Sequence, residues 1–235
     1  MPRSAKTVRS RSGARAVKRA PGGRQAKSAR LYHHGALREA LLQAAERLLE
    51  RDGVQGLTLR AAAREAGVSH AAPKHHFGDL SGLLTDLAIV GFERFRGYLA
   101  TGLQDDLSPR EKLDAIGRGY VAFAKAHPGL FLMMFRSERL DMSRPALRAA
   151  ARASQDVLAS ALGESGAGGG RLTLEAAGRL ARAWSLVHGF SILLIDGRWK
   201  PLLARLPEGS TAEDLLEAAI DSASARRSGG QAAPI

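Results

Sequence analysis

The sequence predicts an all-α protein, with an N-terminal three-helix helix-turn-helix domain followed by a C-terminal helical bundle, about nine helices in total. Apolar residues recur at helical spacing along nearly the whole chain after residue 30, and no segment shows the alternation of a strand. Ser, Thr, Gly and Pro stand where these helical segments begin and end. The 235 residues, of which 45% are hydrophobic, are enough to bury a core.

The composition excludes several classes of protein. There is no Cys, which excludes a disulfide framework, a thiolate metal site and a Cys nucleophile, and which fits a reducing cytosol. No apolar run reaches the roughly 18 residues of a membrane helix, and the N-terminus lacks the apolar stretch of a secretory signal. We therefore expect a cytoplasmic protein with no membrane partner.

Residues 1–30 form a strongly basic arm. They hold ten of the 35 Lys and Arg residues and no Asp or Glu, whereas residues 31–235 carry 25 basic and 23 acidic residues. Because the arm has almost no large apolar side chains, we expect it to be disordered. It is a candidate for tracking DNA phosphates, since each phosphate contact adds salt-dependent affinity. A solubilising extension, or a start site placed too early, would give the same composition.

The helices of the first domain follow one another closely. Residues 37–51 place Leu and Ala on one face of a helix that ends before Gly53. Thr58 is suited to cap a second helix at 59–66. A third, short helix is expected at about 70–76.

A tight turn joins the second and third helices. Gly67 can adopt positive φ there without a Cβ penalty, and Val68 is expected to fill the space between the helices. This spacing is that of a helix-turn-helix, whose second helix lies in the major groove of DNA. Pro73 costs little in a first helical turn, so the reading helix should begin late and stay short, with His70 and Ala71 at its exposed front.

The side chains around this third helix suit DNA. Lys74 is a point charge for a phosphate, and His75 and His76 can donate hydrogen bonds to phosphate oxygens. Ser69 or His70 could reach a base edge, and Ala71 or Ala72 could contact a thymine methyl group. The competing interpretation is a small packed helix with polar residues outside, and a metal site is disfavoured because adjacent His side chains diverge by about 100°. The candidate DNA-binding residues are Thr58, Arg60, Ser69, His70, Ala71, Lys74, His75 and His76.

The rest of the chain contains longer helices. Ser108, Thr173 and Thr211 are suited to cap three of them, the first with Pro109 in the first helical turn. The glycine-rich stretch 163–170 is expected to be a flexible link, since it lacks the Gly-Lys-Ser/Thr ending of a phosphate loop. The expected spans are 80–103, 109–126, 130–136, 144–163, 173–195 and 212–224.

Residues 32–84 resemble the DNA-binding domain of the TetR/AcrR family of bacterial transcriptional regulators, through a brace helix followed by the segments LTLR, AGVS and HF. His76 and Phe77 match the family's usual Leu-Tyr-x-His-Phe-x-x-Lys ending. Lys74 replaces the Tyr and Leu80 replaces the Lys, both of which commonly meet phosphate in the family. Lys74 can substitute for that contact, whereas Leu80 cannot.

A second resemblance lies at residues 183–198, AWSLVHGFSILLIDGR. It is similar to the Trp-x-x-x-His-Gly signature of one TetR-type C-terminal domain, carried here by Trp184, His188 and Gly189. The resemblance implies a nine-helix protein that dimerises through its last two helices and holds a ligand cavity in each C-terminal domain. The implied divisions are a disordered basic arm at 1–30, a DNA-binding domain at 31–79, a ligand-binding and dimerisation domain at 80–224, and a disordered tail at 225–235.

Aromatic and Met residues are the candidates for lining such a cavity. Trp184 and His188 are four residues apart and share one helix face. A buried core Trp with a hydrogen-bonded core His is the competing interpretation, and a Met and Phe stripe is also typical of plain core. The candidate ligand-binding residues are Phe95, Tyr98, Phe123, Phe131, Met134, Phe135, Trp184 and His188.

The sequence therefore predicts a regulator and not an enzyme. No paired carboxylates or Ser-His-Asp spacing stand out, and we expect no catalytic residue, cofactor or metal. The predicted function is a nucleoid-associated repressor that binds a pseudo-palindromic operator in double-stranded DNA as a homodimer and is released by a small apolar effector. The alternative is a non-allosteric, weakly sequence-specific architectural protein dominated by its basic arm. An enzyme on a helical scaffold is a third possibility.

Overall fold

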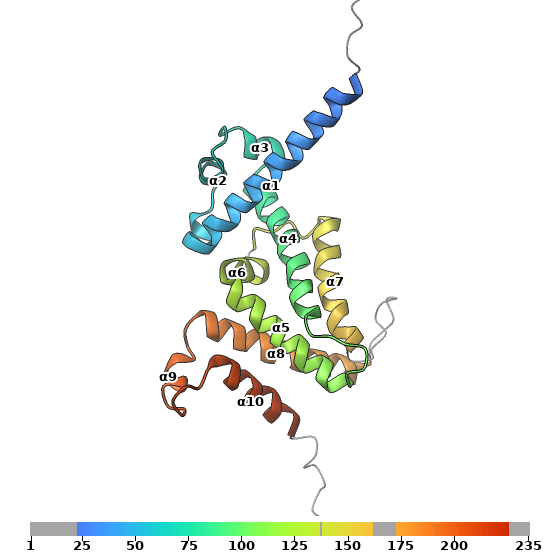
Figure 1. The fold of residues 1–235 in the computed structure, drawn as a ribbon, viewed down its shortest axis with the longest axis vertical. Coiled ribbons are helices and arrows are strands. Elements are labelled where there is room, and N and C mark those ends of the chain that lie inside the picture. The colour runs from blue at the N-terminus through green and yellow to red at the C-terminus, as the bar shows by residue number, and fades with distance from the viewer. Residues whose placement is uncertain (1–22, 137, 162–172, 226–235) are drawn as a thin grey trace, which may run out of the picture. The chain divides into compact units, whose positions relative to one another are not determined.

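The computed structural model describes residues 23–136, 138–161 and 173–225, which form ten α-helices and no strand (Figure 1). The described residues up to Leu37 and those from Arg38 onward form two separate compact units. The helices are α1 Gly23–Gly56, α2 Leu59–Glu65, α3 Ala72–Phe77, α4 Leu80–Ala100, α5 Pro109–Ala126, α6 Pro128–Arg136, α7 Pro145–Ala161, α8 Leu174–Ile195, α9 Lys200–Leu203 and α10 Ala212–Ala225.

Helix α1 begins earlier than the sequence pattern predicts. The backbone is helical from Gly23, so the last residues of the expected disordered arm extend the helix. Arg, Gln, Lys and Ala, which fill much of this stretch, are good helix formers and can propagate a helix that apolar packing nucleates further on. The break comes where expected, because Gly53 has non-helical dihedrals with φ of 68°.

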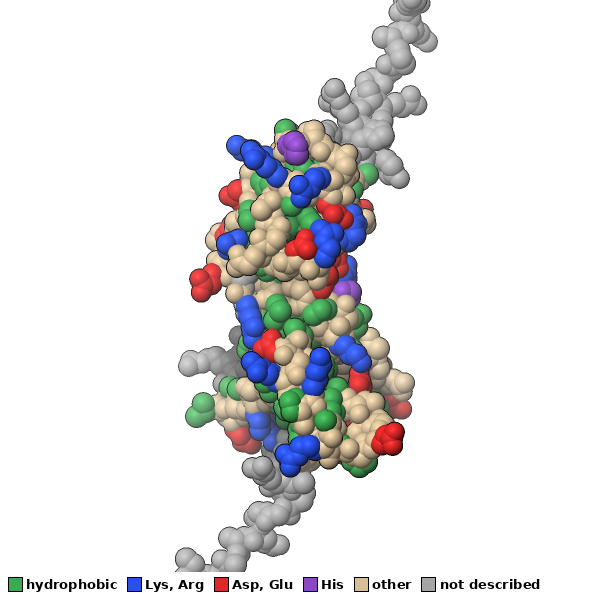
Figure 2. Space-filling model, turned by 90° about the vertical axis from the view of Figure 1, so that its left-hand side faces the viewer, with side chains coloured by type: hydrophobic (Ala, Val, Ile, Leu, Met, Phe, Trp, Pro, Cys, Tyr) green, Lys and Arg blue, Asp and Glu red, His purple; other side chains and the backbone are tan. Residues whose placement is uncertain are grey.

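The first three helices from Arg38 onward, with the turns between them, form the head (residues 38–79). Leu41, Leu48 and Leu49 of α1 are buried, and they share the core with Ala62 and Ala63 of α2. These residues lie on the faces that their spacing predicts. Figure 2 shows Lys and Arg side chains and a His gathered on the outer surface of the head.

Helix α4 connects the head to the remaining helices. It packs along α7 and α5, and it is buried on all sides over residues 83–88 and on one side further on. Gly91 and Gly97 lie inside it without interrupting it, as expected. Because α4 starts directly after α3, any movement of α4 acts on the end of α3.

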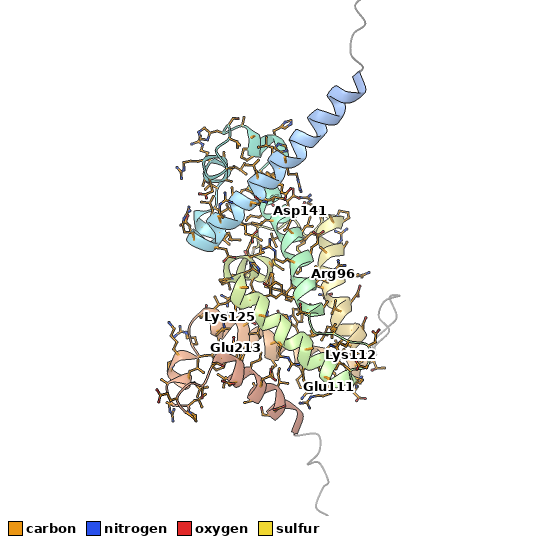
Figure 3. The ribbon with its side chains drawn as sticks, viewed as in Figure 1. Arg96, Glu111, Lys112, Lys125, Asp141 and Glu213 are labelled. Atoms are coloured by element: carbon orange, nitrogen blue, oxygen red, sulfur yellow. The ribbon has the colours of Figure 1, made fainter. Side chains whose placement is uncertain are left out.

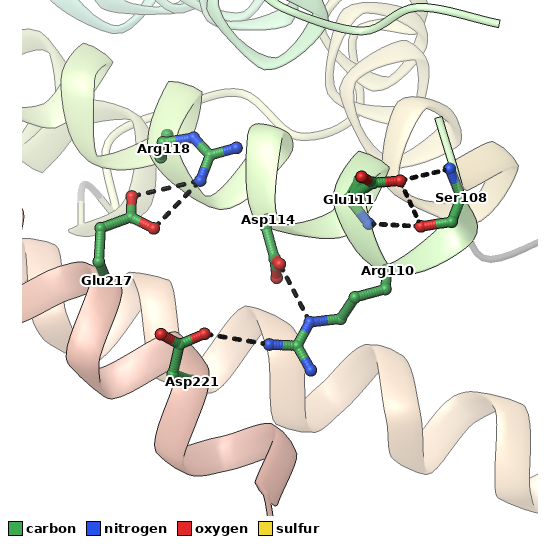
Figure 4. A network of polar contacts seen from close by, with 7 residues as sticks. All are labelled: Ser108, Arg110, Glu111, Asp114, Arg118, Glu217 and Asp221. Atoms are coloured by element: carbon green, nitrogen blue, oxygen red, sulfur yellow. Dashed lines mark hydrogen bonds and ion pairs between the residues drawn. The ribbon is translucent and has the colours of Figure 1, made fainter. Parts of the chain in front are cut away.

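Helices α5, α8 and α10 pack around a second apolar cluster of Val121, Phe190, Leu216 and Ile220. A ladder of ion pairs also joins α5 to α10; Figure 3 labels Lys125 and Glu213 of one pair, and Figure 4 shows the other two. Such exposed pairs each contribute about 0–1 kcal/mol, so the apolar cluster is the main attachment of α10. The pairs are Arg110–Asp221 at 3.3 Å, Arg118–Glu217 at 3.1 Å and Lys125–Glu213 at 2.6 Å.

The predicted helix starts are confirmed at three caps. Ser108 and Glu111 form a reciprocal capping box at α5, and the hydroxyls of Thr173 and Thr211 accept from backbone N–H groups three residues on. Two differences occur in the later helices. Helix α6 begins at Pro128, because Pro fits a first helical turn, and α9 is an extra short helix where a loop was expected. The glycine-rich stretch 163–170 lies outside the described residues.

Candidate nucleic-acid interface and effector site

The turn between α2 and α3 has the predicted geometry. Gly67 adopts a φ of 67°, a conformation that favours glycine, and the N–H of Ala72 donates to the carbonyl of Ser69 at 3.0 Å. Val68 is only partly buried, so it fills the space between the helices less completely than expected. Pro73 and Phe77 are buried instead, and they provide most of the apolar contact of α3.

The position of Pro73 explains the short reading helix. Helix α3 begins at Ala72, so Pro73 lies in the first turn, where its missing N–H has no helical acceptor. The helix has six residues and ends at Gly78, whose φ is 78°. The late start and the short length are both as predicted.

Most of the predicted DNA-binding residues are exposed on the head. Thr58 is exposed, but its hydroxyl caps α2 by accepting from the N–H of Ala61 at 3.0 Å. His76 is half-buried. The turn and the short helix thus place small, polar and basic side chains together at the surface. The fully exposed candidates are Arg60, Ser69, His70, Ala71, Lys74 and His75.

A buried carboxylate that sequence reasoning missed connects the head to the body. Asp86 of α4 is 5% exposed, and its two oxygens each lie 2.7 Å from a guanidinium nitrogen, Oδ2 from Arg38 of α1 and Oδ1 from Arg144 before α7. The Oδ1 contact is an ion pair, since this atom accepts no hydrogen bond from the described residues. The guanidinium of Arg38 also lies 5.7 Å from the centre of the Phe77 ring, within cation–π range. Asp86 therefore holds α1, α4 and the end of α3 to the start of α7.

Neighbouring contacts fix the same junction. The N–H of Asp141, labelled in Figure 3, donates to Thr85 Oγ1 at 2.9 Å, and Ser81 Oγ donates to the carbonyl of Arg139 at 2.7 Å. In the sequence, the only indication of this junction was a charged residue, Asp86, within the apolar run LLTDLAIV.

A second junction ties α1 to the start of α6. The carboxylate of Glu50 accepts from the N–H groups of Gly129 and Leu130 at 2.8 and 3.0 Å, which caps α6. Glu46 forms an ion pair with Arg94 of α4, and this contact raises the pKa of the Arg94 guanidinium. The head is thus attached to α4, α6 and the α7 start by charged contacts.

The predicted ligand-binding residues form two groups that Phe123 joins, since its ring lies 5.0 Å from that of Phe95. Tyr98 and Phe123 lie beside His127, at the side of the second junction. The others surround a residue that the sequence did not single out, Tyr120 of α5, except Met134, which lies against Gly91. These rings are closely packed, and Phe95, Phe123 and Phe131 are buried. The group around Tyr120 is Phe95, Phe131, Phe135, Trp184 and His188.

A chain of hydrogen bonds runs through the second group. Trp184 Nε1 donates to the phenol oxygen of Tyr120 at 3.2 Å, and that phenol lies 2.8 Å from Nδ1 of His188. Tyr120 is 5% exposed, and its burial raises the pKa of the phenol well above the usual range. Trp184, for which a buried core position was the competing interpretation, is 47% exposed and lies at the edge of the group.

Burial lowers the pKa of His188, and the positive charge of Arg136 lowers it further. The unfolded state therefore binds more protons below a pH of about 6.5, so the stability that this residue contributes is complete above that pH and is lost as the pH falls through it. We expect urea titrations to give a larger drop in the free energy of unfolding between about pH 7.5 and pH 5.5 for the wild type than for His188→Asn. The exposed His70→Asn is the control, and an unchanged drop in His188→Asn would contradict the assignment.

The described residues contain no helix that is both long and apolar enough to cross a bilayer. They also contain no group of three or more His, Asp or Glu side chains arranged to hold a metal ion.

Comparison with known proteins places both halves of the chain in one family. Residues 41–87 match the family model of bacterial regulatory proteins of the tetR family, and residues 113–223 match that of the tetracyclin repressor-like C-terminal domain. No curated protein matches the chain.

Solved structures agree with the family models. A protein of unknown function from Rhodococcus sp. RHA1 is 35% identical, with a TM-score of 0.63 over 81% of this chain and 95% of that one. The TetR family transcriptional regulator PfmR from Thermus thermophilus is 20% identical, with a TM-score of 0.55 over 77% and 94% of the two chains. The Bacillus subtilis regulator FadR, solved with stearoyl-CoA, is 12% identical, with a TM-score of 0.58 over 78% and 95%. The last two structures show the fold alone. The two family models together match more than half of the chain, and on that ground the chain belongs to the TetR family of bacterial transcriptional regulators.

Proposed function

We propose that the protein is a cytoplasmic, non-enzymatic repressor that binds a pseudo-palindromic operator as a homodimer and releases it when a small effector binds the C-terminal domain. The observation that carries the proposal is the exposed turn and short helix at residues 69–75, which offer His, Lys and Ala side chains on a head of helix-turn-helix geometry. In such heads the start of the second helix faces base edges while basic side chains meet phosphates.

The test is DNA binding by fluorescence anisotropy, with the DNA beside the protein's own gene as the probe and scrambled DNA as the competitor. A specific regulator should prefer the native fragment by about a thousandfold or more. Equal affinity for both DNAs would remove the proposal and favour the weakly specific, arm-dominated alternative, whose affinity depends steeply on salt.

Lys74 is an exposed cation on the short reading helix, where it could contact a DNA phosphate. We expect Lys74→Ala to weaken operator binding by about tenfold and to reduce the slope of log affinity against log salt by about one. The matched control is Arg96→Ala, which removes an exposed cation from α4 (Figure 3) away from α3. Equal losses in the two variants would mean that Lys74 acts only through net charge.

The outward face of α8 supports the homodimer. Gly178 and Gly189 have no atom within 4 Å of the position where a Cβ would stand, and Ala181 and Ser185 between them are exposed. These positions fall on one side of a helix with 3.6 residues per turn, opposite to the buried Val187. Small residues at such spacing allow two helices to approach closely, and Leu193 next to them is also exposed.

Gly189 is the last of the small residues on this face, one turn before the exposed Leu193. We expect Gly189→Arg to convert the dimer into monomer at micromolar concentration, because the side chain and its charge would separate the two copies of α8. Sedimentation velocity measures the change, with Ala122→Arg on the exposed side of α5 as the control. A dimer that survives Gly189→Arg would exclude this face as the interface.

Direct continuity between α3 and α4 supports the release step. Only Gly78 and Asp79 separate the helices, and Asp79 caps α4 by accepting from the N–H of Gly82 at 2.8 Å. An effector that moves α4 would therefore shift the spacing of the two reading helices. A coupling free energy of about 1–3 kcal/mol, typical of allostery, changes DNA affinity some 5- to 150-fold. The fold shared with FadR, which was solved with stearoyl-CoA, agrees with a largely apolar effector.

A further inference from the structure

One direction of the hydrogen-bond chain through Tyr120 gives an acceptor to both donors, the indole N–H and the phenol O–H. The raised pKa of the buried phenol keeps its proton on, so Tyr120 is a neutral O–H group. Its oxygen accepts from Trp184 Nε1, and an indole N–H can only donate. The phenol proton is then free to be donated to Nδ1 of His188, 2.8 Å away. The chain runs from Trp184 through Tyr120 to His188.

This direction fixes the tautomer of His188. The lowered pKa keeps the imidazole neutral at pH 7, and a neutral imidazole that accepts at Nδ1 carries its proton at Nε2. No described residue accepts a hydrogen bond from Nε2. Among the described residues, Asp86 Oδ1 is the one side-chain polar atom that is fully buried without a hydrogen-bond partner. Because Nε2 of His188 also lacks a partner there, it must be at least slightly exposed. In this tautomer His188 presents an N–H donor that is not fully buried.

The surroundings of this donor select a flat, apolar molecule with a negative charge. The ring of His188 lies 5.6 Å from that of Phe131, 5.3 Å from that of Phe135 and 6.3 Å from that of Trp184, measured between centroids. Phe131 is fully buried, whereas Phe135 and Trp184 are partly exposed, so the group is open on their side. Arg136 follows Phe135 and is exposed, and its positive charge adds to burial in lowering the pKa of His188.

We propose that His188 Nε2–H and the guanidinium of Arg136 bind the carboxylate of a planar, conjugated acid, whose apolar body lies against Trp184 and Phe135. The inference rests on the proposed function and names the chemical class of its effector. One N–H donor and one guanidinium match a monoanion, and the aromatic rings match a conjugated body. Tyr120 is a positioning residue, because it holds the imidazole in the tautomer that can donate.

The test is isothermal titration calorimetry on the full-length protein with cinnamate as the probe. We expect saturable binding with a Kd of about 0.1 mM, a reasonable value for a ligand of this size. Cinnamamide, which has the same shape without the charge, should bind about tenfold more weakly or not at all. His188→Phe, which keeps a ring but removes the donor, and Arg136→Gln should each weaken cinnamate binding by about tenfold or more. Arg152→Gln, which changes an exposed Arg of α7, should bind as the wild type does.

The role of Tyr120 has its own readout. In ¹⁵N spectra of His-labelled protein, wild-type His188 should show the Nε2–H tautomer, and Tyr120→Phe should shift it toward a mixture while weakening cinnamate binding. A Tyr120→Phe variant that keeps both the tautomer and the affinity would remove its positioning role.

The outcomes separate this inference from the proposed function. Equal binding of cinnamate and cinnamamide, no saturable binding of cinnamate, or unchanged affinity in His188→Phe would overturn the carboxylate site while leaving specific DNA binding intact. Saturable cinnamate binding by a protein that does not prefer its own upstream DNA would support the site and overturn the repressor.

Discussion

Asp86→Asn is expected to lower the free energy of unfolding by about 3 kcal/mol, near the lower end of the range for breaking a buried ion pair. The substitution keeps the shape of the side chain but removes the charge that neutralises two guanidinium groups. Arg38 and Arg144 are 44% and 36% exposed, so water can reach them in part and the loss stays below the maximum. Urea titrations followed by far-UV circular dichroism, at one protein concentration, measure the change.

The chain offers a matched control for this substitution. Asp221 also pairs with an Arg, but it is 79% exposed, and Asp221→Asn should change the stability by less than about 1 kcal/mol. If Asp86→Asn and Asp221→Asn lowered the free energy of unfolding by the same small amount, the Asp86 junction would contribute no more than a surface ion pair. Arg144→Gln should fall between them, since it removes one partner and leaves Arg38 in place.

Local patterns explain why most of the fold could be predicted. Each confirmed helix start rests on a cap whose partner lies three residues away, as at Ser108 and Thr173. The short reading helix follows from the covalent geometry of Pro73, and the turn before it follows from Gly67. These are properties of neighbouring residues, which the sequence displays directly.

The missed features depend on partners far away in the chain. Asp86 is paired with Arg38 and Arg144, and Tyr120 with residues 64 and 68 positions later. Periodicity assigns a face to a residue, but it does not say which polar group on another helix meets that face. The start of α1 was missed for a related reason, because a basic composition argues for disorder while helix propagation from a packed segment argues against it.

The head is attached to the body by the two junctions and by the short link between α3 and α4. Asp86 joins α4 to α1 and the α7 start, Glu50 joins α1 to α6, and α3 continues almost directly into α4. A rearrangement of the rings around Tyr120, which come from α4, α5, α6 and α8, would reach the head through the same helices. In the proposed release step, the contact between the end of α3 and the first turn of α4 would transmit this movement to the reading helix.

Gly82→Ala tests that point, and we expect it to weaken operator binding by about tenfold to a hundredfold while the body stays folded. A Cβ on Gly82 would stand 2.0 Å from the backbone carbonyl oxygen of Phe77, so α3 must move away from α4 to make room. Each base contact that the displaced reading helix loses should weaken the free energy of DNA binding by about 1–3 kcal/mol. The control is Gly97→Ala on the same helix, where no atom lies within 4 Å of the new Cβ and where Ala should raise stability by up to about 1 kcal/mol without changing DNA affinity. Fluorescence anisotropy with the native fragment measures both variants, and circular dichroism verifies that both are folded. If Gly82→Ala bound DNA as tightly as Gly97→Ala, the contact between Phe77 and α4 would not set the position of the reading helix, and the release step would need another route.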